Sequence, residues 1–151
     1  MRILKNILIL LYSGITLGLV LSSTLAQESQ PLSNPADKPI VIQVKNIEFT
    51  LKKNGIDMVM ISLNQPAAIN LFALDRDSPK VVVDIQNVLE WKGSQKIPVN
   101  GRCIKQLRIH LHKDQKKLRI AIDLVNPAKE YLVSPFYNEN TNVYRLEIQE
   151  K

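Results

Sequence analysis

From residue 40 to residue 148, apolar and polar residues alternate in short runs that are separated by turn-forming residues. A period of two places successive side chains on opposite faces of an extended strand, whereas a helix requires a period near 3.6. No stretch of this region has a convincing helical period. The alternation predicts nine strands, at 40–44, 47–51, 57–63, 69–74, 80–88, 104–111, 118–124, 131–133 and 143–148. Short strands at such regular spacing predict an all-β domain, either a sandwich or a barrel.

Two strand pairs can be assigned from the turns between them. Asn54-Gly55 is a strong hairpin signal, because both residues tolerate a positive φ, and it predicts a hairpin over residues 47–63. If Leu111 pairs with Leu118 across the Lys113–Lys117 turn, residues 104–124 form a second hairpin. Its opposite face then carries polar and cationic side chains, namely Arg108, His110, Arg119 and Asp123.

An internal repeat joins the two halves of this region. The segment VMISLNQPA at 59–67 aligns with IAIDLVNPA at 120–128, and VVVDI at 81–85 aligns with YRLEI at 144–148. A group of strands cannot bury its apolar face alone, so two copies packed face to face would form one core. We therefore expect a sandwich of two pseudo-symmetric β-sheets with an approximate two-fold axis.

The N-terminal residues have the pattern of a secretory signal peptide. Two basic residues precede an apolar run over 7–21, and small residues lead to a cleavage site that we place after Ala26. The alternative is an uncleaved membrane anchor, although the run is shorter than the ~20 residues that span a bilayer. Residues 27–39 are proline-rich and predict a flexible tether, so the folded domain is expected at 40–149.

Composition and motifs argue against several classes of function. After removal of residues 1–26 the chain would have 18 basic and 14 acidic residues, a net charge of +4 that suits contact with an anionic polymer. It lacks the dense basic stripe of a nucleic-acid-binding protein. The full chain has five glycines and no phosphate-binding loop, catalytic triad or nucleophilic cysteine motif, so we expect no enzyme and no cofactor. Asp75 and Asp77 are better explained by turn formation than by acid–base chemistry.

Four residues invite a functional interpretation that the sequence does not favour. Cys103 has no partner for an internal disulfide and is expected to be a buried thiol. His110 and His112 lie on one face of a strand, but no carboxylate or cysteine is spaced to complete a metal site, so no metal is expected. Trp91 either stacks on a sugar or covers the edge of the core, and we favour the core.

Several motifs together resemble the AMIN domain. They are Pro66-Ala67 after a strand, then SPKVVVDI at 78–85, IKQLRI at 104–109 and LRIAIDL at 118–124, and the resemblance covers about residues 40–149. The family occurs in the periplasm of Gram-negative bacteria, in N-acetylmuramoyl-L-alanine amidases and type IV pilus secretins. The resemblance implies two symmetric β-sheets and a periplasmic location. Lys80 stands where the family usually has arginine, which keeps the charge but loses the bidentate geometry.

The resemblance implies a non-catalytic module that binds peptidoglycan and localises itself or a partner at the cell wall. No amidase or secretin domain is expected to follow it. The alternative is an interaction subunit of an envelope machine, such as a type IV pilus or secretion apparatus, whose partner is an amidase, a secretin or another envelope protein. The expected wall contacts are Arg108 and Arg119, followed by Lys80, Arg102 and His110. The competing interpretation is a solvated hairpin face in which Arg108 pairs with Asp123.

Overall fold

The computed structural model describes residues 39–74 and 78–151, which form one compact β-rich unit. The expected signal peptide at 1–26, nearly all of the tether at 27–39, and Asp75 and Asp77 lie outside the described residues. Among the residues that are described, none belongs to a helix of the length and apolarity needed to cross a membrane. All described strands and the whole core lie within residues 38–151, so this segment contains what the fold requires.

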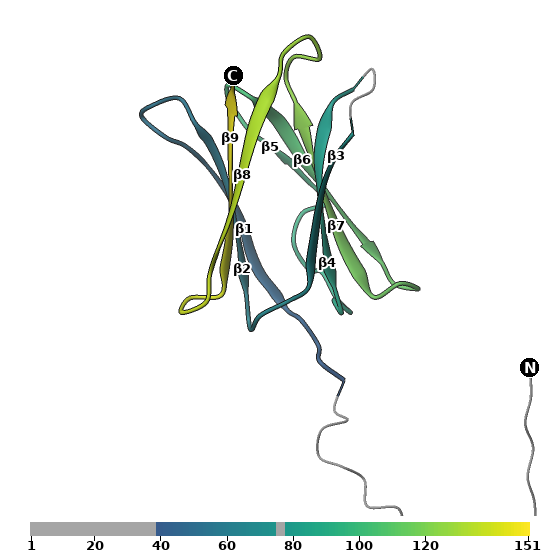
Figure 1. Ribbon diagram of the computed structural model, residues 1–151. Coiled ribbons are helices and arrows are strands. Elements are labelled where there is room, and N and C mark those ends of the chain that lie inside the picture. The colour runs from purple at the N-terminus through teal and green to yellow at the C-terminus, as the bar shows by residue number, and fades with distance from the viewer. Residues whose placement is uncertain (1–38, 75–77) are drawn as a thin grey trace, which may run out of the picture. The chain divides into compact units, whose positions relative to one another are not determined.

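Within the described residues, nine strands form two antiparallel sheets. Figure 1 shows the two sheets facing each other. The four-stranded sheet has the order β1-β2-β9-β8 and the five-stranded sheet the order β3-β4-β7-β6-β5. The expected all-β sandwich is confirmed. The strands are β1 (Val44–Leu51), β2 (Asp57–Leu63), β3 (Ile69–Leu74), β4 (Lys80–Gln86), β5 (Lys96–Pro98), β6 (Ile104–His112), β7 (Lys117–Leu124), β8 (Tyr131–Asn138) and β9 (Val143–Glu150).

The two copies of the repeat interlock instead of forming one sheet each. The first hairpin of copy one, β1–β2, pairs with the second hairpin of copy two, β8–β9, through β2 and β9. In the other sheet β6–β7 pairs in the same way with β3–β4, through β7 and β4. The register repeats too, because Val59 lies opposite Leu146 and its counterpart Ile120 lies opposite Val83. The expected pseudo-symmetry is thus realised by an exchange of hairpins.

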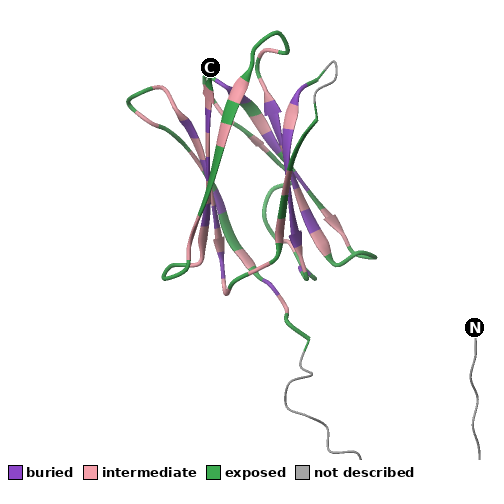
Figure 2. Cartoon of the chain, in the orientation of Figure 1, coloured by how far each residue is buried: buried purple, intermediate pink, exposed green. Residues whose placement is uncertain are grey.

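The core lies between the sheets and is built from the in-phase apolar residues of both. Figure 2 shows buried residues on the inner strands of each sheet. In β2 burial alternates strictly, and Val59, Ile61 and Leu63 are at most 1% exposed. The central strand β7 contributes Ile120 and Ile122 from the opposite side, both fully buried. Full burial of each such side chain stabilises the fold by about 1.5–3 kcal/mol.

The structure differs from the expected strands in three places. Residues 40–43 are not a strand; Ile42 instead makes an isolated parallel bridge to Val88 and is buried. The short strand β5 was not predicted, because three residues with one inward apolar side chain, Ile97, are too few for a periodic signal. The β8 strand also continues past the expected end at residue 133, through Pro135.

A buried carboxylate ties the start of β2 to the start of β6. Asp57 is fully buried, and its two carboxylate oxygens accept hydrogen bonds from the backbone N–H groups of Arg102, Cys103 and Ile104 at 2.8–3.1 Å. Residue 101 must be a glycine, because a Cβ at this position would clash with Oδ2 of Asp57. The carboxylate therefore satisfies three backbone donors that would otherwise be buried without acceptors.

The expectations for Cys103 and Trp91 are confirmed. Cys103 is 2% exposed, and burial raises the pKa of its thiol above the ordinary value. Trp91 packs against the core, and its indole N–H donates to the carbonyl oxygen of Ser94 at 3.2 Å. Its ring lies so close to Gly93 that a Cβ there would be 2.2 Å from it. The tryptophan thus contributes to the hydrophobic core at its edge.

Candidate binding face

The outer surface of the five-stranded sheet gathers basic side chains on its three central strands. Alternation sends one set of side chains of β4, β6 and β7 into the core and the other set to the outside. We call the outward set the cationic face; its charged and imidazole members are Lys80, Asp84, Arg108, His110, His112, Lys117, Arg119 and Asp123. Four of the eight carry a fixed positive charge and two a negative one, so the net charge of the face is positive.

Arg119 is held by a two-point contact with Asp84 directly across the β4–β7 ladder. Its Nε and Nη2 donate to Oδ1 and Oδ2 of Asp84, both at 2.7 Å, and the Nζ of Lys117 lies 3.2 Å from Oδ2. Asp84 is 5% exposed. The hydrogen bonds from Arg119 lower the pKa of Asp84 and raise that of Arg119. Parallel N–H···O bonds of this kind fix the plane of the guanidinium group as well as its position.

Arg108 makes the equivalent contact with Asp123, from β6 to β7. Its Nε and Nη2 donate to the two carboxylate oxygens at 2.7 Å, and Gln106 Nε2 adds a bond of 2.6 Å. Burial of Asp123 by itself would raise its pKa, but the hydrogen bonds from Arg108 and Gln106 outweigh burial and the pKa is lowered. The pairing of Arg108 with Asp123 that the sequence suggested is therefore present.

The two arginines are ordered and still accessible. Their side chains are 47% (Arg108) and 38% (Arg119) exposed. A guanidinium group has five N–H donors, so a two-point contact leaves three of them. The Arg119 guanidinium also lies 5.6 Å from the ring centre of Phe72 on β3. Val82, which points to the same side, is only 2% exposed, so close packing and ion pairing hold this surface in place.

Four of the five candidate residues from the sequence lie on this face. Lys80 sits directly opposite Asp123 in the β4–β7 register, and His110 lies opposite Arg119. The rings of His110 and His112 meet edge to face at 4.6 Å. Arg102 lies elsewhere, at the end of the sandwich beside Gly55 in the β1–β2 turn. The sequence predicts Arg102 near the others because it lies just before β6. It does not show that the residues before β6 run to the end of the sandwich.

Asp84 and Lys117 are members of the site that sequence analysis did not identify. An aspartate within the apolar run 81–85 was a usable signal, because a charge in a buried strand requires a partner. That partner could not be named without knowing that β4 pairs with β7, some 35 residues away.

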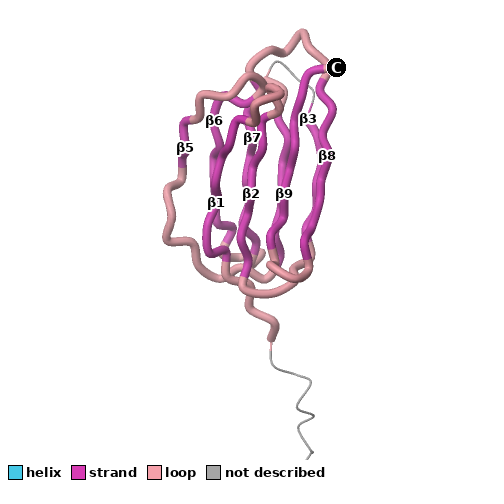
Figure 3. Tube along the Cα trace, turned by 90° about the vertical axis from the view of Figure 1, so that its left-hand side faces the viewer, coloured by secondary structure: helices cyan, strands magenta, loops and turns pink. Residues whose placement is uncertain are grey.

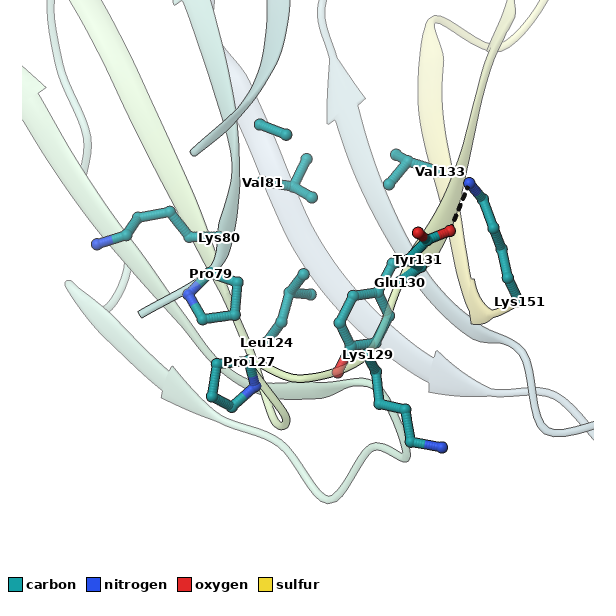
Figure 4. Close-up of a pocket in the computed structure, with 11 residues that line it drawn as sticks. Pro79, Lys80, Val81, Leu124, Pro127, Lys129, Glu130, Tyr131, Val133 and Lys151 are labelled. Carbon is teal, nitrogen blue, oxygen red and sulfur yellow. Dashed lines mark hydrogen bonds and ion pairs between the residues drawn. The ribbon is translucent and has the colours of Figure 1, made fainter. Parts of the chain in front are cut away.

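A cleft of about 480 Å³ is lined by residues of both sheets. Figure 4 shows the side chains that line it. Its walls include Val81 from one sheet and Val133 from the other, with Tyr131 nearby. Glu130, the carboxylate that lines it, forms an ion pair with Lys151 at 3.2 Å. Within residues 39–74 and 78–151, no three His, Cys, Asp or Glu side chains are grouped so as to hold a metal ion.

The ion pairs predict a loss of stability in acid. The pKa values of Asp84, Asp123 and Glu147 are all lower than usual, the last mainly through a hydrogen bond from Lys52. A carboxyl group with a lowered pKa stabilises the folded state fully above its unfolded pKa, near 4, and this contribution disappears as the pH falls through the folded pKa. We expect the free energy of unfolding, measured in urea between pH 7 and pH 2, to decline steeply below about pH 4. A constant or rising value there would contradict the assignment, and Glu147→Gln should make the decline shallower.

Comparison with known proteins agrees with the resemblance found in the sequence. The family model described as AMIN domain matches residues 46–148, from within β1 to within β9. No curated protein matches the chain. The matched range includes every residue of the cationic face.

Proposed function

Because the chain belongs to the AMIN domain family, a family of periplasmic modules associated with peptidoglycan in general, we propose that it binds peptidoglycan non-covalently through its cationic face. The observation that carries the proposal is the pair of two-point contacts, Arg108 with Asp123 and Arg119 with Asp84. They hold two guanidinium planes in fixed orientations on a sheet surface while both remain partly exposed. Such a site costs little ordering entropy when a ligand arrives.

The ligand groups that match this face are the carboxylates of the stem peptides and the hydroxyl groups of the glycan. The remaining N–H donors of Arg108 and Arg119 can bond either one, and a guanidinium already paired to an aspartate keeps its charge at every physiological pH. Lys80 and Lys117 add positive charge on the same strands. The aspartates partly neutralise the face, so we expect modest affinity with a clear dependence on salt concentration.

We further propose that binding occurs without catalysis, and that it holds the module or a partner protein at the wall. The support is chemical. Both acidic groups of the cationic face are fully engaged with arginines, and their lowered pKa values suit structural anions better than proton donors at neutral pH. The carboxylate in the cleft, that of Glu130, is paired with a lysine as well.

Co-sedimentation with isolated Gram-negative sacculi tests the proposal. Purified residues 38–151 should sediment with sacculi, and an Arg108→Ala/Arg119→Ala variant should bind at least about tenfold more weakly, the loss expected for two charged hydrogen-bonding groups. The matched control is Arg102→Ala/Arg145→Ala, which removes the same charge from outside the cationic face. Circular dichroism and thermal unfolding establish that each variant is folded.

The outcomes separate three explanations. Equal loss in both double variants would mean that binding follows net charge and not the cationic face. An Arg108→Lys/Arg119→Lys variant that binds as well as the wild type would show that charge suffices without planar hydrogen bonding. If the wild-type protein stays in the supernatant at every salt concentration, peptidoglycan is not its ligand.

A second candidate function is that of an interaction subunit in an envelope machine. It is favoured by the exposed side chains of Leu132 and Phe136 on the outer face of β8, which are 44% and 49% exposed. A partner docking there would lose contact on Leu132→Ser/Phe136→Ser substitution, while the arginine variants would keep it. In cells, the two functions are distinguished by which double variant abolishes the localisation of the protein.

A further inference from the structure

The described sheets present four edge strands, and three of them carry a feature that discourages the addition of another strand. The register of β1 breaks between Val44 and Asn46, beside the charged Lys45. The edge strand β5 has three residues and ends in Pro98. In β8 the obstacle is Pro135, in the middle of the strand. Figure 3 shows β1 and β8 at the two sides of the four-stranded sheet.

The remaining edge strand, β3, has none of these features. Its sequence, INLFAL, contains no charge and no proline, and its register with β4 is continuous from Ile69 to Leu74. Two outward side chains, Phe72 and Leu74, are 37% and 42% exposed. An uncharged, regular edge strand with exposed apolar side chains is a template for strand pairing.

The hydrogen-bond ladder identifies which backbone groups of β3 are free. Gln86 N–H donates to the carbonyl oxygen of Ala68, so Ala68 and every second residue after it bond to β4. The N–H and C=O groups of the alternate residues, Ile69, Leu71 and Ala73, consequently point to the open edge. These three residues offer six backbone groups to a strand placed alongside.

The internal repeat makes β3 and β8 equivalent edge strands, but the two differ in sequence. Pro135 lies opposite Leu146 and Leu71 lies opposite Val83, and Leu146 and Val83 are equivalent positions of the repeat. Leu71 is therefore the counterpart of Pro135. The bond from Lys151 N–H to the carbonyl oxygen of Glu130 fixes the alternation in β8 and directs the nitrogen of Pro135 to the open edge. One copy of the repeat closes its edge at the position where the other leaves it open.

We propose that β3 pairs antiparallel with β3 of a second copy of this chain, which joins two five-stranded sheets into one continuous sheet. Centred on Leu71, the pairing places Leu71 opposite Leu71, Ile69 opposite Ala73, and Asn70 opposite Phe72. The strand is its own complement in this register. No charge meets a like charge, large Ile69 faces small Ala73, and all six free backbone groups of each strand find partners.

This argument selects a second copy over an unrelated strand because the chain itself supplies every complementary residue. The contact involves six residues from each protomer, which is less than a standard interface, so we expect dissociation constants on the order of micromolar or weaker. Pairing would extend the outer surface of the sheet across both protomers and set two cationic faces side by side. On a repeating polymer such as the wall glycan, two linked sites gain avidity without any new contact.

Sedimentation equilibrium of residues 38–151 tests the proposal without the cell wall, so its result is independent of the peptidoglycan experiment. We expect the mass to rise from monomer to dimer between about 1 µM and 1 mM. Ala73→Pro removes an N–H at the open edge and leaves the ladder with β4 intact, so the variant should fold and its dissociation constant should rise at least tenfold. Ala73→Val, which retains the N–H, is the matched control and should dimerise.

Hydrogen exchange on the wild-type protein gives a second, residue-specific measurement. The amides of Ile69, Leu71 and Ala73 should exchange rapidly at low concentration and become protected at high concentration. Those of Asn70 and Phe72, which bond to β4, should be protected throughout. A mass that stays monomeric up to 1 mM, or a dimer that Ala73→Pro leaves unchanged, overturns the proposal. If the protein is monomeric, the partner of the β3 edge would instead be a strand from a different protein.

Discussion

Asp57→Ala is expected to lower the free energy of unfolding by about 3–5 kcal/mol, because it leaves three buried backbone N–H groups without an acceptor. The carboxylate accepts all three bonds in a site from which water is excluded, since Asp57 is fully buried. The two elements that it ties together, β2 and β6, belong to different sheets. The loss would be measured by urea denaturation at pH 7.

The matched control is Asp114→Ala, which removes an exposed carboxylate from the β6–β7 turn and should change stability by no more than about 0.5 kcal/mol. Asp57→Asn should fall between the two, because an amide retains one acceptor oxygen but turns two N–H donors toward other donors. If Asp57→Ala cost less than about 1 kcal/mol, water would have to reach these donors in the variant, and the site would not be the closed anchor described above.

Asp84→Asn is expected to cost about 2–3 kcal/mol, because two basic groups depend on this one carboxylate. Arg119 contacts both of its oxygens, and Lys117, whose side chain is 13% exposed, contacts one. Without the negative charge, both cations lose their shared carboxylate partner, and the nearly buried Lys117 is left without a counter-charge at that contact. Urea denaturation at pH 7 measures the change, and the same experiment at pH 3 should show a smaller difference, since Asp84 of the wild type is then closer to its own protonation.

An exposed ion pair provides the comparison for Asp84. Glu90 and Lys92 lie 3.4 Å apart with side chains 68% and 80% exposed. Glu90→Gln should change stability by less than about 0.5 kcal/mol, as is usual for pairs in water. Equal effects of Glu90→Gln and Asp84→Asn would mean that the ion pairs of the cationic face are ordinary surface pairs, and that its geometry is not held in place as we propose.

Sequence periodicity predicted the hairpins well because their registers are local. Leu111 does pair with Leu118, and Leu107 with Ile122, as a short turn between two alternating strands requires. The arrangement of the hairpins in two sheets was harder to predict. Residues far apart in the chain decide it, and a repeat is compatible both with one sheet per copy and with an exchange between copies.

The same distinction explains the result for the candidate site. Arg108, His110 and Arg119 were grouped correctly because one hairpin carries all three, and local register places them on one face. Arg102 precedes that hairpin, and its position depends on the hydrogen bonds that its own backbone N–H and that of Cys103 donate to Asp57. The distant β4 strand contributes Asp84, so the strongest contact of Arg119 could not be foreseen from β6 and β7 alone.

The exchange of hairpins has a consequence for how the chain acquires its structure. Each half of the domain, taken alone, is two hairpins that belong to different sheets, and each of its central strands has only one of its two neighbours within that half. We therefore expect that neither half folds on its own before the other has been synthesised. The long-range pairing of β2 with β9 spans nearly the whole domain, and folding of this kind is slow. The sheet of β1, β2, β8 and β9 is therefore complete only once the last strand of the chain is available to pair with β2.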